Sequence, residues 1–295
     1  MGYTTKNKIG KVISVFSDAN GVGATSTTAA MVATALSCKG KKVLLITMDH
    51  DTMDAVSYLT DSVVETTLDD LMILANSNGL TKTSDFDTYV YSLSESLDAV
   101  RGSSKFDRLS GDPADCMMNI IDLAQYRYHF VVVDIQGRSS QTARTVMNES
   151  DLVIYAIGQS VKQLDNLVDD RIFDPEMMNE EAYAMFVATN YTERDFLNVK
   201  TMEKRLKQSG FYVISHDEDV MKSSSLKNLY PVVAKATNGG GSGGFLGFGK
   251  KKGGDTLSTE LGAITDVIMS SLVEPDEEPK YGRRHKRKFN TESED

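Results

Sequence analysis

The sequence predicts an α/β protein in which a mainly parallel sheet is covered by helices on both faces. Short stretches that are almost entirely apolar alternate with longer stretches whose apolar residues recur at helical spacing. Strands that are apolar throughout are typical of a parallel sheet buried on both faces. With 295 residues, 40% of them hydrophobic and 25% charged, the protein is long enough to bury a substantial core.

Residues 11–36 hold the most informative unit of this pattern. Val12–Phe16 is a short apolar run, a turn with two glycines follows, and a helical segment then extends to Leu36. Strand, glycine turn and helix in this order are the context that a phosphate-binding loop requires. Glycine lets the backbone approach an anion, and the N–H groups at the helix start point toward it. A turn that only joins the strand to the helix is the alternative.

The rest of the sequence continues the alternation. The other predicted strands are 43–47, 88–93, 97–100, 130–134, 152–157, 182–189 and 211–214. The other predicted helices are 67–75, 113–123, 142–148, 161–168, 193–209 and 256–272, and residues 77–87 are expected to form a loop. Thr67 suits a helix cap, and Pro113 suits the first position of a helix.

We expect one domain over residues 1–273, with a glycine-rich insertion at 238–254. Residues 274–295 carry an acidic cluster, a basic cluster and then acids again, with little apolar content. Such a segment buries too little surface to fold alone, so a disordered charged tail is expected there.

Charge and cysteine use restrict the class of function. The net charge of -10 and the pI near 5.0 argue against a protein that binds nucleic acid through electrostatic attraction. Cys38 and Cys116 match no metal-ligand spacing and are expected to be small buried residues, not a disulfide. The first residues lack the apolar core of a signal peptide, and no apolar run is long enough to span a bilayer. A cytoplasmic protein is expected.

Three motifs in this order resemble the deviant-Walker-A P-loop family of ParA and MinD. The family's loop, K-G-G-x-G-K-[ST], corresponds to residues 19–25, and its second-strand D-x-D motif to residues 47–49. A third family motif, D-x-P-P-G, corresponds to residues 134–137 in the middle of this sequence. Residues 215–233 resemble the family's last strand and loop. The resemblance extends to about Leu272 and implies a P-loop NTPase-like three-layer sandwich.

The resemblance also implies roles for individual residues. ATP or ADP is expected on the loop, on the helix start and on an adenine-facing asparagine that ends a strand; these residues are Gly21, Val22, Gly23, Ala24, Thr25, Ser26 and Asn190. The accompanying Mg²⁺ is expected on Thr25 and Asp134. Asp49, the surviving acid of the D-x-D motif, is the catalytic candidate.

The charged groups of the family site are largely replaced. Ala24 stands where the family has a lysine that neutralises phosphate charge, and Ala19 where a second lysine reaches a partner's nucleotide. Thr47 replaces the acid that orients the attacking water. Phosphoryl transfer needs positive charge where the transition state gathers negative charge. A weak ATPase or a pseudo-ATPase is therefore expected.

A loop reading G-G-x-G-A-[ST] is typical of the TadZ/CpaE pilus-assembly branch, and residues 20–25 are similar to it, although such proteins usually carry a receiver-like domain ahead of the ATPase. This similarity implies a homodimer and a protein partner in a pilus, secretion or positioning system. Residues 244–252 combine phenylalanines with three lysines and suit a peripheral contact at the inner face of the cell membrane. A flexible linker is the alternative for that segment.

Three functions stay open on this basis. The first is a spatial-organisation protein that binds ATP weakly or without efficient hydrolysis and positions a pilus or secretion machine. The second is an active ATPase for plasmid or chromosome partition; the acidic body makes the DNA contact that this requires unlikely on charge grounds. The third is an adaptor that uses the fold as a scaffold and binds no nucleotide.

Overall fold

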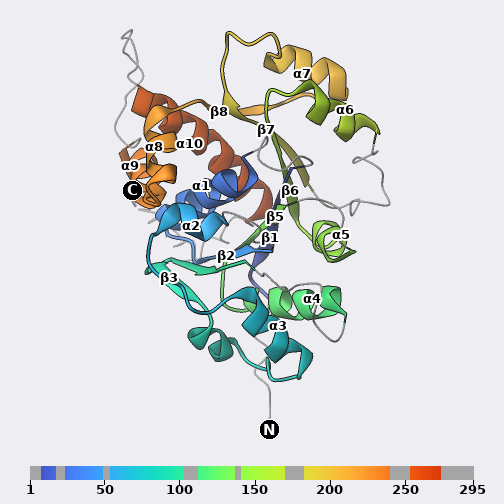
Figure 1. Cartoon of the computed structure of the whole chain (residues 1–295), viewed down its shortest axis with the longest axis vertical. Coiled ribbons are helices and arrows are strands. Elements are labelled where there is room, and N and C mark those ends of the chain that lie inside the picture. Colours follow the sequence, from blue (N-terminus) through green and yellow to red (C-terminus); the bar gives the residue numbers. More distant parts are fainter. Residues whose placement is uncertain are drawn as a thin grey trace, which may run out of the picture.

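The computed structural model describes residues 8–17, 24–48, 54–102, 112–136, 141–169, 183–239 and 253–273 (Figure 1). In these ranges, eight strands form one sheet in the order β3-β4-β2-β5-β1-β6-β7-β8. Every neighbouring pair is parallel except β3 and β4. The strands are β1 (Lys11–Ser17), β2 (Val43–Thr47), β3 (Tyr91–Ser94), β4 (Leu97–Val100), β5 (Phe130–Gln136), β6 (Leu152–Ile157), β7 (Tyr183–Tyr191) and β8 (Tyr212–Ser215).

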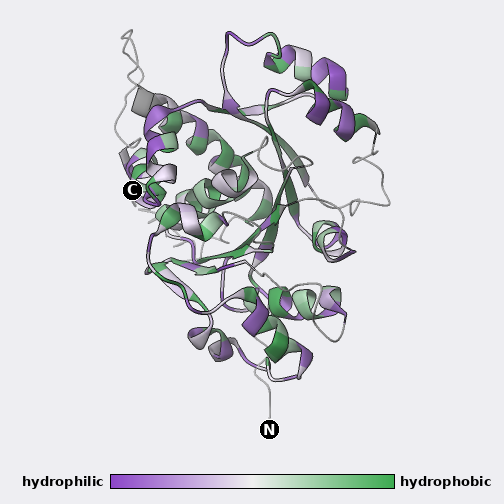
Figure 2. Ribbon diagram, viewed as in Figure 1, coloured by the Kyte–Doolittle hydropathy of each residue, from purple (hydrophilic) through white to green (hydrophobic). Residues whose placement is uncertain are grey.

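Helices cover both faces of this sheet, which confirms the predicted fold class (Figure 1). One face carries α3 (Leu68–Asn76), α4 (Pro113–Ala124), α5 (Gln141–Asn148), α6 (Val161–Asp169) and α7 (Val199–Leu206). The other carries α1 (Thr25–Cys38), α2 (Ala55–Leu59), α8 (Glu218–Ser225), α9 (Leu229–Gly239) and α10 (Gly253–Leu272). The sheet and the helix faces turned toward it are hydrophobic, and the outer helix faces are hydrophilic (Figure 2).

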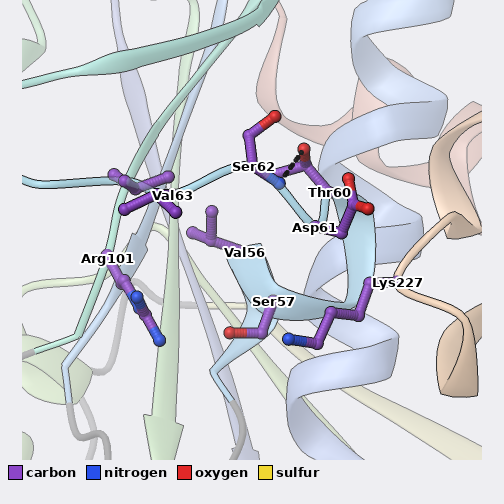
Figure 3. A pocket seen from close by; sticks show the side chains of 9 residues that line it. Val56, Ser57, Thr60, Asp61, Ser62, Val63, Arg101 and Lys227 are labelled. Carbon is purple, nitrogen blue, oxygen red and sulfur yellow. Dashed lines mark hydrogen bonds between the residues drawn. The ribbon is translucent and has the colours of Figure 1, made fainter.

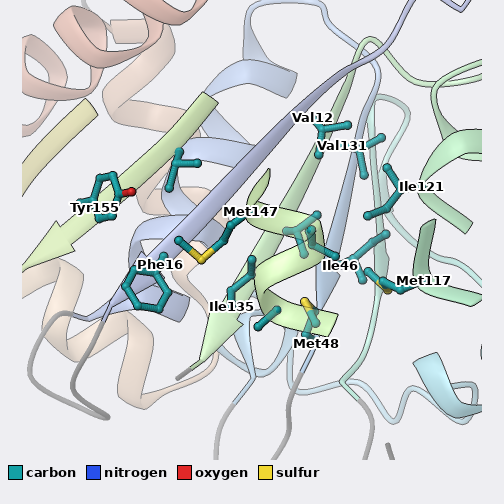
Figure 4. Close-up of a cluster of buried hydrophobic side chains, with 14 of the residues drawn as sticks. Val12, Phe16, Ile46, Met48, Met117, Ile121, Val131, Ile135, Met147 and Tyr155 are labelled. Atoms are coloured by element: carbon teal, nitrogen blue, oxygen red, sulfur yellow. The ribbon is translucent and has the colours of Figure 1, made fainter. Parts of the chain in front are cut away.

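A row of aromatic side chains crosses the core on the first face, and Figure 4 shows its first two members, Phe16 and Tyr155. The rings of Phe16 and Tyr155 meet edge to face with centroids 6.1 Å apart. Tyr155 stacks on Phe186 at 5.4 Å, and Phe186 stacks on Phe211 at 5.3 Å. Aromatic pairs at these distances stabilise a core beyond the area they bury. The row ties β1, β6 and β7 together below the edge where the candidate site lies.

Helix α1 forms the centre of the core on the second face. Its residues from Thr28 to Ser37 are all buried, because β1, α9 and α10 enclose it. Its alanines let these neighbours approach closely, since a methyl group needs little room. A helix covered on every side needs apolar or small residues all round, and the composition of α1 meets that need.

The helix predicted over 193–209 is wrong at its beginning. Helix α7 begins at Val199, and the side chain of Asn198 accepts a hydrogen bond from the Thr201 N–H at 3.1 Å. The preceding residues are held outside the helix by Gln159. Its amide donates to the carbonyl oxygens of Thr192 and Leu197 at 3.0 and 2.9 Å. This constraint comes from the end of β6, so the local pattern does not reveal it.

Other differences are small helices that the sequence pattern does not reveal. A 3-10 helix, η1 (Thr83–Thr88), occupies part of the predicted loop 77–87, so β3 begins only at Tyr91. Helix α2 is too short to show a period. Residues 215–233, compared with a last strand and loop, include only the last residue of β8 and then form α8 and the start of α9.

Several expectations fall outside the described residues. These are the loop glycines, Asp49, the segment 244–252 and the tail 274–295. Cys38 and Cys116 are both free thiols, Cys116 buried and Cys38 partly exposed. Within the described ranges, no helix combines the length and the apolar character needed to cross a bilayer.

We predict opposite effects from alanine at two glycines. A Cβ at Gly10 would lie 2.5 Å from the Tyr128 carbonyl oxygen and 2.7 Å from the Gln125 Cα, both backbone atoms. Gly10→Ala should therefore lower the free energy of unfolding by about 1–3 kcal/mol. Gly262 lies within α10 with nothing within 4 Å of such a Cβ. Gly262→Ala should raise it by about 0.5–1 kcal/mol through helix propensity.

Urea unfolding followed by circular dichroism measures both changes. Equal midpoints for the two variants would contradict the packing of Gly10 against the α4–β5 turn.

Candidate functional site

The candidate site lies where the carboxyl ends of β1, β2 and β5 meet the start of α1. The register pairs Ser17 with Gln136 and Thr47 with Asp134, so these three strands end at one edge. Parallel strands deliver their final side chains to the same edge, where the loops that follow them gather. The predicted metal residues Thr25 and Asp134 and the replaced acid Thr47 therefore come from neighbouring elements.

The described part of the predicted phosphate loop begins at Ala24. This residue has φ 46° and ψ 42°, a left-handed conformation that is uncommon outside glycine. Helix α1 begins at Thr25, and its hydrogen-bond ladder begins with Thr28 N–H donating to the Ala24 carbonyl at 2.8 Å. The N–H groups of the first turn precede that ladder, so this end carries the partial positive charge of the helix. Gly21, Val22 and Gly23 lie outside the described residues.

Asp134 is the acidic group at the centre of this edge. It is fully buried at the end of β5, and its carbonyl accepts a hydrogen bond from Met48 N–H at 3.0 Å. Tyr58 of α2 lies near it and hydrogen-bonds the side chain of Thr27 in the first turn of α1. Burial raises the pKa of the Tyr58 phenol, and the charge of Asp134 raises it further. The phenol is thus neutral at physiological pH, and its hydrogen bond to Thr27 connects α2 to the first turn of α1.

The donor types at this edge fit Mg²⁺. This ion prefers oxygen ligands and keeps several waters, so a carboxylate and a hydroxyl are the groups that it needs from the protein. Asp134 supplies the carboxylate and Thr25, the first residue of α1, the hydroxyl. Among the described residues no cluster of three His, Cys, Asp or Glu side chains could hold a metal by itself.

The Thr47 side chain makes a contact that supports the structure, and it has no carboxylate that could act in catalysis. Its side chain is fully buried, and its hydroxyl accepts a hydrogen bond from Ala55 N–H at 3.2 Å. Ala55 is the first residue of α2, whose cap is Asp54. A neutral hydroxyl cannot act as a carboxylate base at physiological pH. The position that is acidic in the resembled family therefore anchors a helix here.

Asn190 lies two strands away from β1, near the end of β7. It is exposed, with φ 50°, and its side-chain oxygen lies 2.6 Å from Nδ1 of His216. Strand spacing places β7 about 10 Å from β1, a separation that suits a base at one end of a nucleotide and phosphates at the other. The residue before His216 is also fixed, because Glu260 of α10 accepts hydrogen bonds from the Ser215 N–H and hydroxyl at 2.9 and 2.5 Å.

Sequence reasoning did not find three residues of this neighbourhood: Tyr58, Gln163 and His216. Gln163 of α6 is buried, and its amide nitrogen donates to the hydroxyl of Ser17, the last described residue before the loop, at 2.7 Å. Its amide oxygen accepts from Gly158 N–H at 2.8 Å, so Gln163 links the ends of β1 and β6. In the sequence Gln163 stands directly before Leu164 and four residues before Leu167, so a polar residue on the apolar side of the predicted helix 161–168 was the available signal. No sequence signal marks Tyr58.

Two lysines that are near the phosphate loop in the sequence, Lys11 and Lys39, lie at the opposite end of β1 and α1. They therefore cannot supply the positive charge that Ala24 lacks. Lys11 begins β1 and pairs with Asp151 at 3.0 Å. Lys39 follows the last residue of α1 and pairs with Asp266 of α10 at 2.5 Å. Both positions are a full strand or helix length away from the phosphate-loop end.

Comparison with known proteins supports this assignment of the fold. A family described as "AAA domain" matches residues 10–168, just over half of the sequence. No curated protein sequence matches this one.

Solved structures with the same fold are numerous. A ParA family ATPase from Chlorobium tepidum has a TM-score of 0.69 and 19% identity, over 86% of this chain and 98% of that one. The septum site-determining protein MinD from Pyrococcus horikoshii, complexed with Mg-ADP, has a TM-score of 0.62 and 17% identity, over 88% and 98%. A putative plasmid partition protein from Borrelia burgdorferi, bound to AMPPNP, has a TM-score of 0.58 and 18% identity, over 88% and 99%.

At sequence identities below 20%, the similarity to these solved structures establishes only the fold. Membership of the family rests on the match of the family model. The mainly parallel sheet with helices on both faces is consistent with both. This chain belongs to the AAA-domain family and has the P-loop fold of the ParA and MinD ATPases.

Proposed function

We propose that this protein is a ParA/MinD-like spatial-organisation protein that binds ATP with Mg²⁺ weakly or without efficient hydrolysis. The observation that carries the proposal is the contrast at one edge of the sheet. The start of α1 and the buried Asp134 keep the arrangement that suits phosphate and Mg²⁺. Ala24 and Thr47 are neutral where the resembled family has charge.

Nucleotide binding is supported by groups that do not depend on the missing lysines. Backbone N–H groups at a helix start bind phosphate through hydrogen bonds and through the helix dipole. Thr25 and Asp134 supply oxygen ligands for the metal ion, and Asn190 with His216 offers polar groups for a base. Two of the solved structures with this fold contain Mg-ADP and AMPPNP.

Efficient hydrolysis would need charge that these positions no longer provide. The transition state of phosphoryl transfer is stabilised by cations, and one such group changes the rate by orders of magnitude. Ala24 removes a cation from the loop, and the Thr47 hydroxyl is engaged with the start of α2. Asp49 remains the candidate for a catalytic acid. The site is thus suited to holding a nucleotide more than to cleaving it.

The positioning role is proposed from the fold and from charge. A MinC:MinD cell division complex from Aquifex aeolicus shares this fold, with a TM-score of 0.64 at 15% identity. We place the present protein in the same class of function, as a homodimer that recruits a protein of a pilus or secretion machine in the manner of TadZ and CpaE. Its net charge of -10 counts against the DNA-binding partition ATPase.

A calorimetric titration with ATP and Mg²⁺, followed by a phosphate-release assay, tests the proposal. We expect saturable binding with very slow turnover, because backbone donors hold phosphate without stabilising the transition state. Rapid hydrolysis stimulated by DNA would establish the partition ATPase instead. The absence of any nucleotide affinity would leave the scaffold adaptor.

The effect of the missing lysine is testable by restoring it. Ala24→Lys should tighten ATP binding by about tenfold, as a charge-assisted hydrogen bond to phosphate allows. Hydrolysis should stay slow because Thr47 is unchanged. Ala24→Gln, of similar length and without charge, is the matched control. Equal ATP affinity in both variants would show that residue 24 does not face the phosphates.

The proposed membrane contact through residues 244–252 depends on two aromatic side chains beside three lysines. Replacing Phe245 and Phe248 by serine should release the protein from anionic liposomes in a co-sedimentation assay, because apolar insertion and lysine attraction act together. Unchanged co-sedimentation would favour a plain linker.

A further inference from the structure

A hollow with a mixed polar and apolar lining lies beside α2. It has a volume of about 140 Å³ and is lined by α2, the residues that follow it, Arg101 after β4 and Lys227 after α8 (Figure 3). This is well below the roughly 300–1,000 Å³ of pockets that enclose whole cofactors or drug-sized ligands. A group of a few heavy atoms is therefore the appropriate occupant.

A single hydrogen bond, from its Nε to Asp54, holds the Arg101 side chain in this hollow. Its Nε donates to Oδ2 of Asp54 at 2.9 Å, and the Asp54 side chain is fully buried. The other oxygen of Asp54 accepts a hydrogen bond from Ser57 N–H at 2.6 Å. With the described residues, the two terminal amino groups of Arg101 make no hydrogen bond. The guanidinium is thus oriented and still has donors available for a ligand.

Lys227 adds a second cation from a different element. Its backbone is left-handed, with φ 56°, and its N–H donates to the Ser224 carbonyl at 3.0 Å. Lys227 is exposed and forms no ion pair with a described residue. In Figure 3, Arg101, Ser57 and Lys227 end on the same side of α2, whereas the carboxylate of Asp61 is directed to the other side.

The remaining wall is mixed and partly open to solvent, with the polar residues Thr60, Asp61 and Ser62 beside three valines. Val56 is buried beneath the hollow, whereas Val63 at its rim is 83% exposed. Leu226, the residue directly before Lys227, is 64% exposed. An inorganic ion gains nothing from these side chains. A peptide with an apolar residue beside an acidic one would cover them and neutralise the cations at once.

We propose that this hollow is an oxyanion site that receives the carboxylate of an acidic protein segment. Arg101 and Lys227 bind the carboxylate, the Ser57 hydroxyl adds a donor, and Val63 packs against the adjoining apolar residue of the partner. Inorganic phosphate shares the oxyanion chemistry and is the simplest competing ligand. None of the described residues that line this hollow belongs to the proposed nucleotide site, so the two proposed sites use different side chains.

The test uses the full-length protein and two acetylated, amidated tripeptides, Val-Glu-Leu and Val-Gln-Leu, together with sodium phosphate at constant ionic strength. Binding is measured by calorimetry or by amide chemical-shift changes. Lys227→Asn removes the cation and suits the left-handed backbone. Lys222→Asn, which removes an exposed lysine of α8 outside the hollow, is the matched control.

We expect the glutamate peptide to bind more tightly than the glutamine peptide, and Lys227→Asn to weaken it by about tenfold, as loss of a charge-assisted hydrogen bond implies. Lys222→Asn should leave it unchanged. Equal binding of the two peptides, or equal weakening by both substitutions, would overturn the proposal. So would phosphate binding that survives Lys227→Asn and competes with the peptide. ATP affinity should be the same in all three proteins, which keeps this result independent of the nucleotide site.

Discussion

The enclosure of α1 between the sheet and the helices α9 and α10 is the constraint on which the rest of the structure depends. β1 is paired on both sides by parallel strands, so its direction and register are set by two neighbours. α1 returns antiparallel to it along the sheet, as the right-handed crossover requires. Because every side of α1 is packed, its first turn has a defined position at the carboxyl edge. Phosphate binding by backbone groups needs that rigidity, since N–H donors must be aligned before the anion arrives.

The same edge illustrates how a catalytic position becomes a structural one. Residue 47 pairs with Asp134 on the neighbouring strand. A carboxylate at residue 47 would therefore place two buried negative charges side by side, and they would repel each other. The threonine avoids this repulsion and uses its hydroxyl to hold the start of α2. Asp54 then caps α2 and orients Arg101 on the outer surface. The threonine at residue 47 thus begins a series of contacts that runs from the end of β2 through α2 to Arg101 on the outer surface.

The second half of the sequence supports the site from a distance. Gln163 joins the ends of β1 and β6, and Gln159 holds the segment between β7 and α7 away from helix. Glu260 of α10 fixes Ser215 beside the pair formed by Asn190 and His216. The polar side chains of Gln159, Gln163 and Glu260 all have satisfied partners, which is the usual condition for polar groups inside a protein. Through Glu260, the position of Ser215 depends on α10, near the end of the sequence.

The sequence alone determined the fold class, because uniformly apolar strands separated by amphipathic helices have few other arrangements. It also predicted a phosphate loop between β1 and α1, and it shows directly that residues 24 and 47 are uncharged. The short α2, the late start of α7 and the roles of Tyr58, Gln163 and His216 were decided only by tertiary structure. Each depends on a contact with a residue far away in the sequence, such as Gln163 with Ser17. Local periodicity reports which face of an element is buried, and it carries no information about the distant side chain that will meet it.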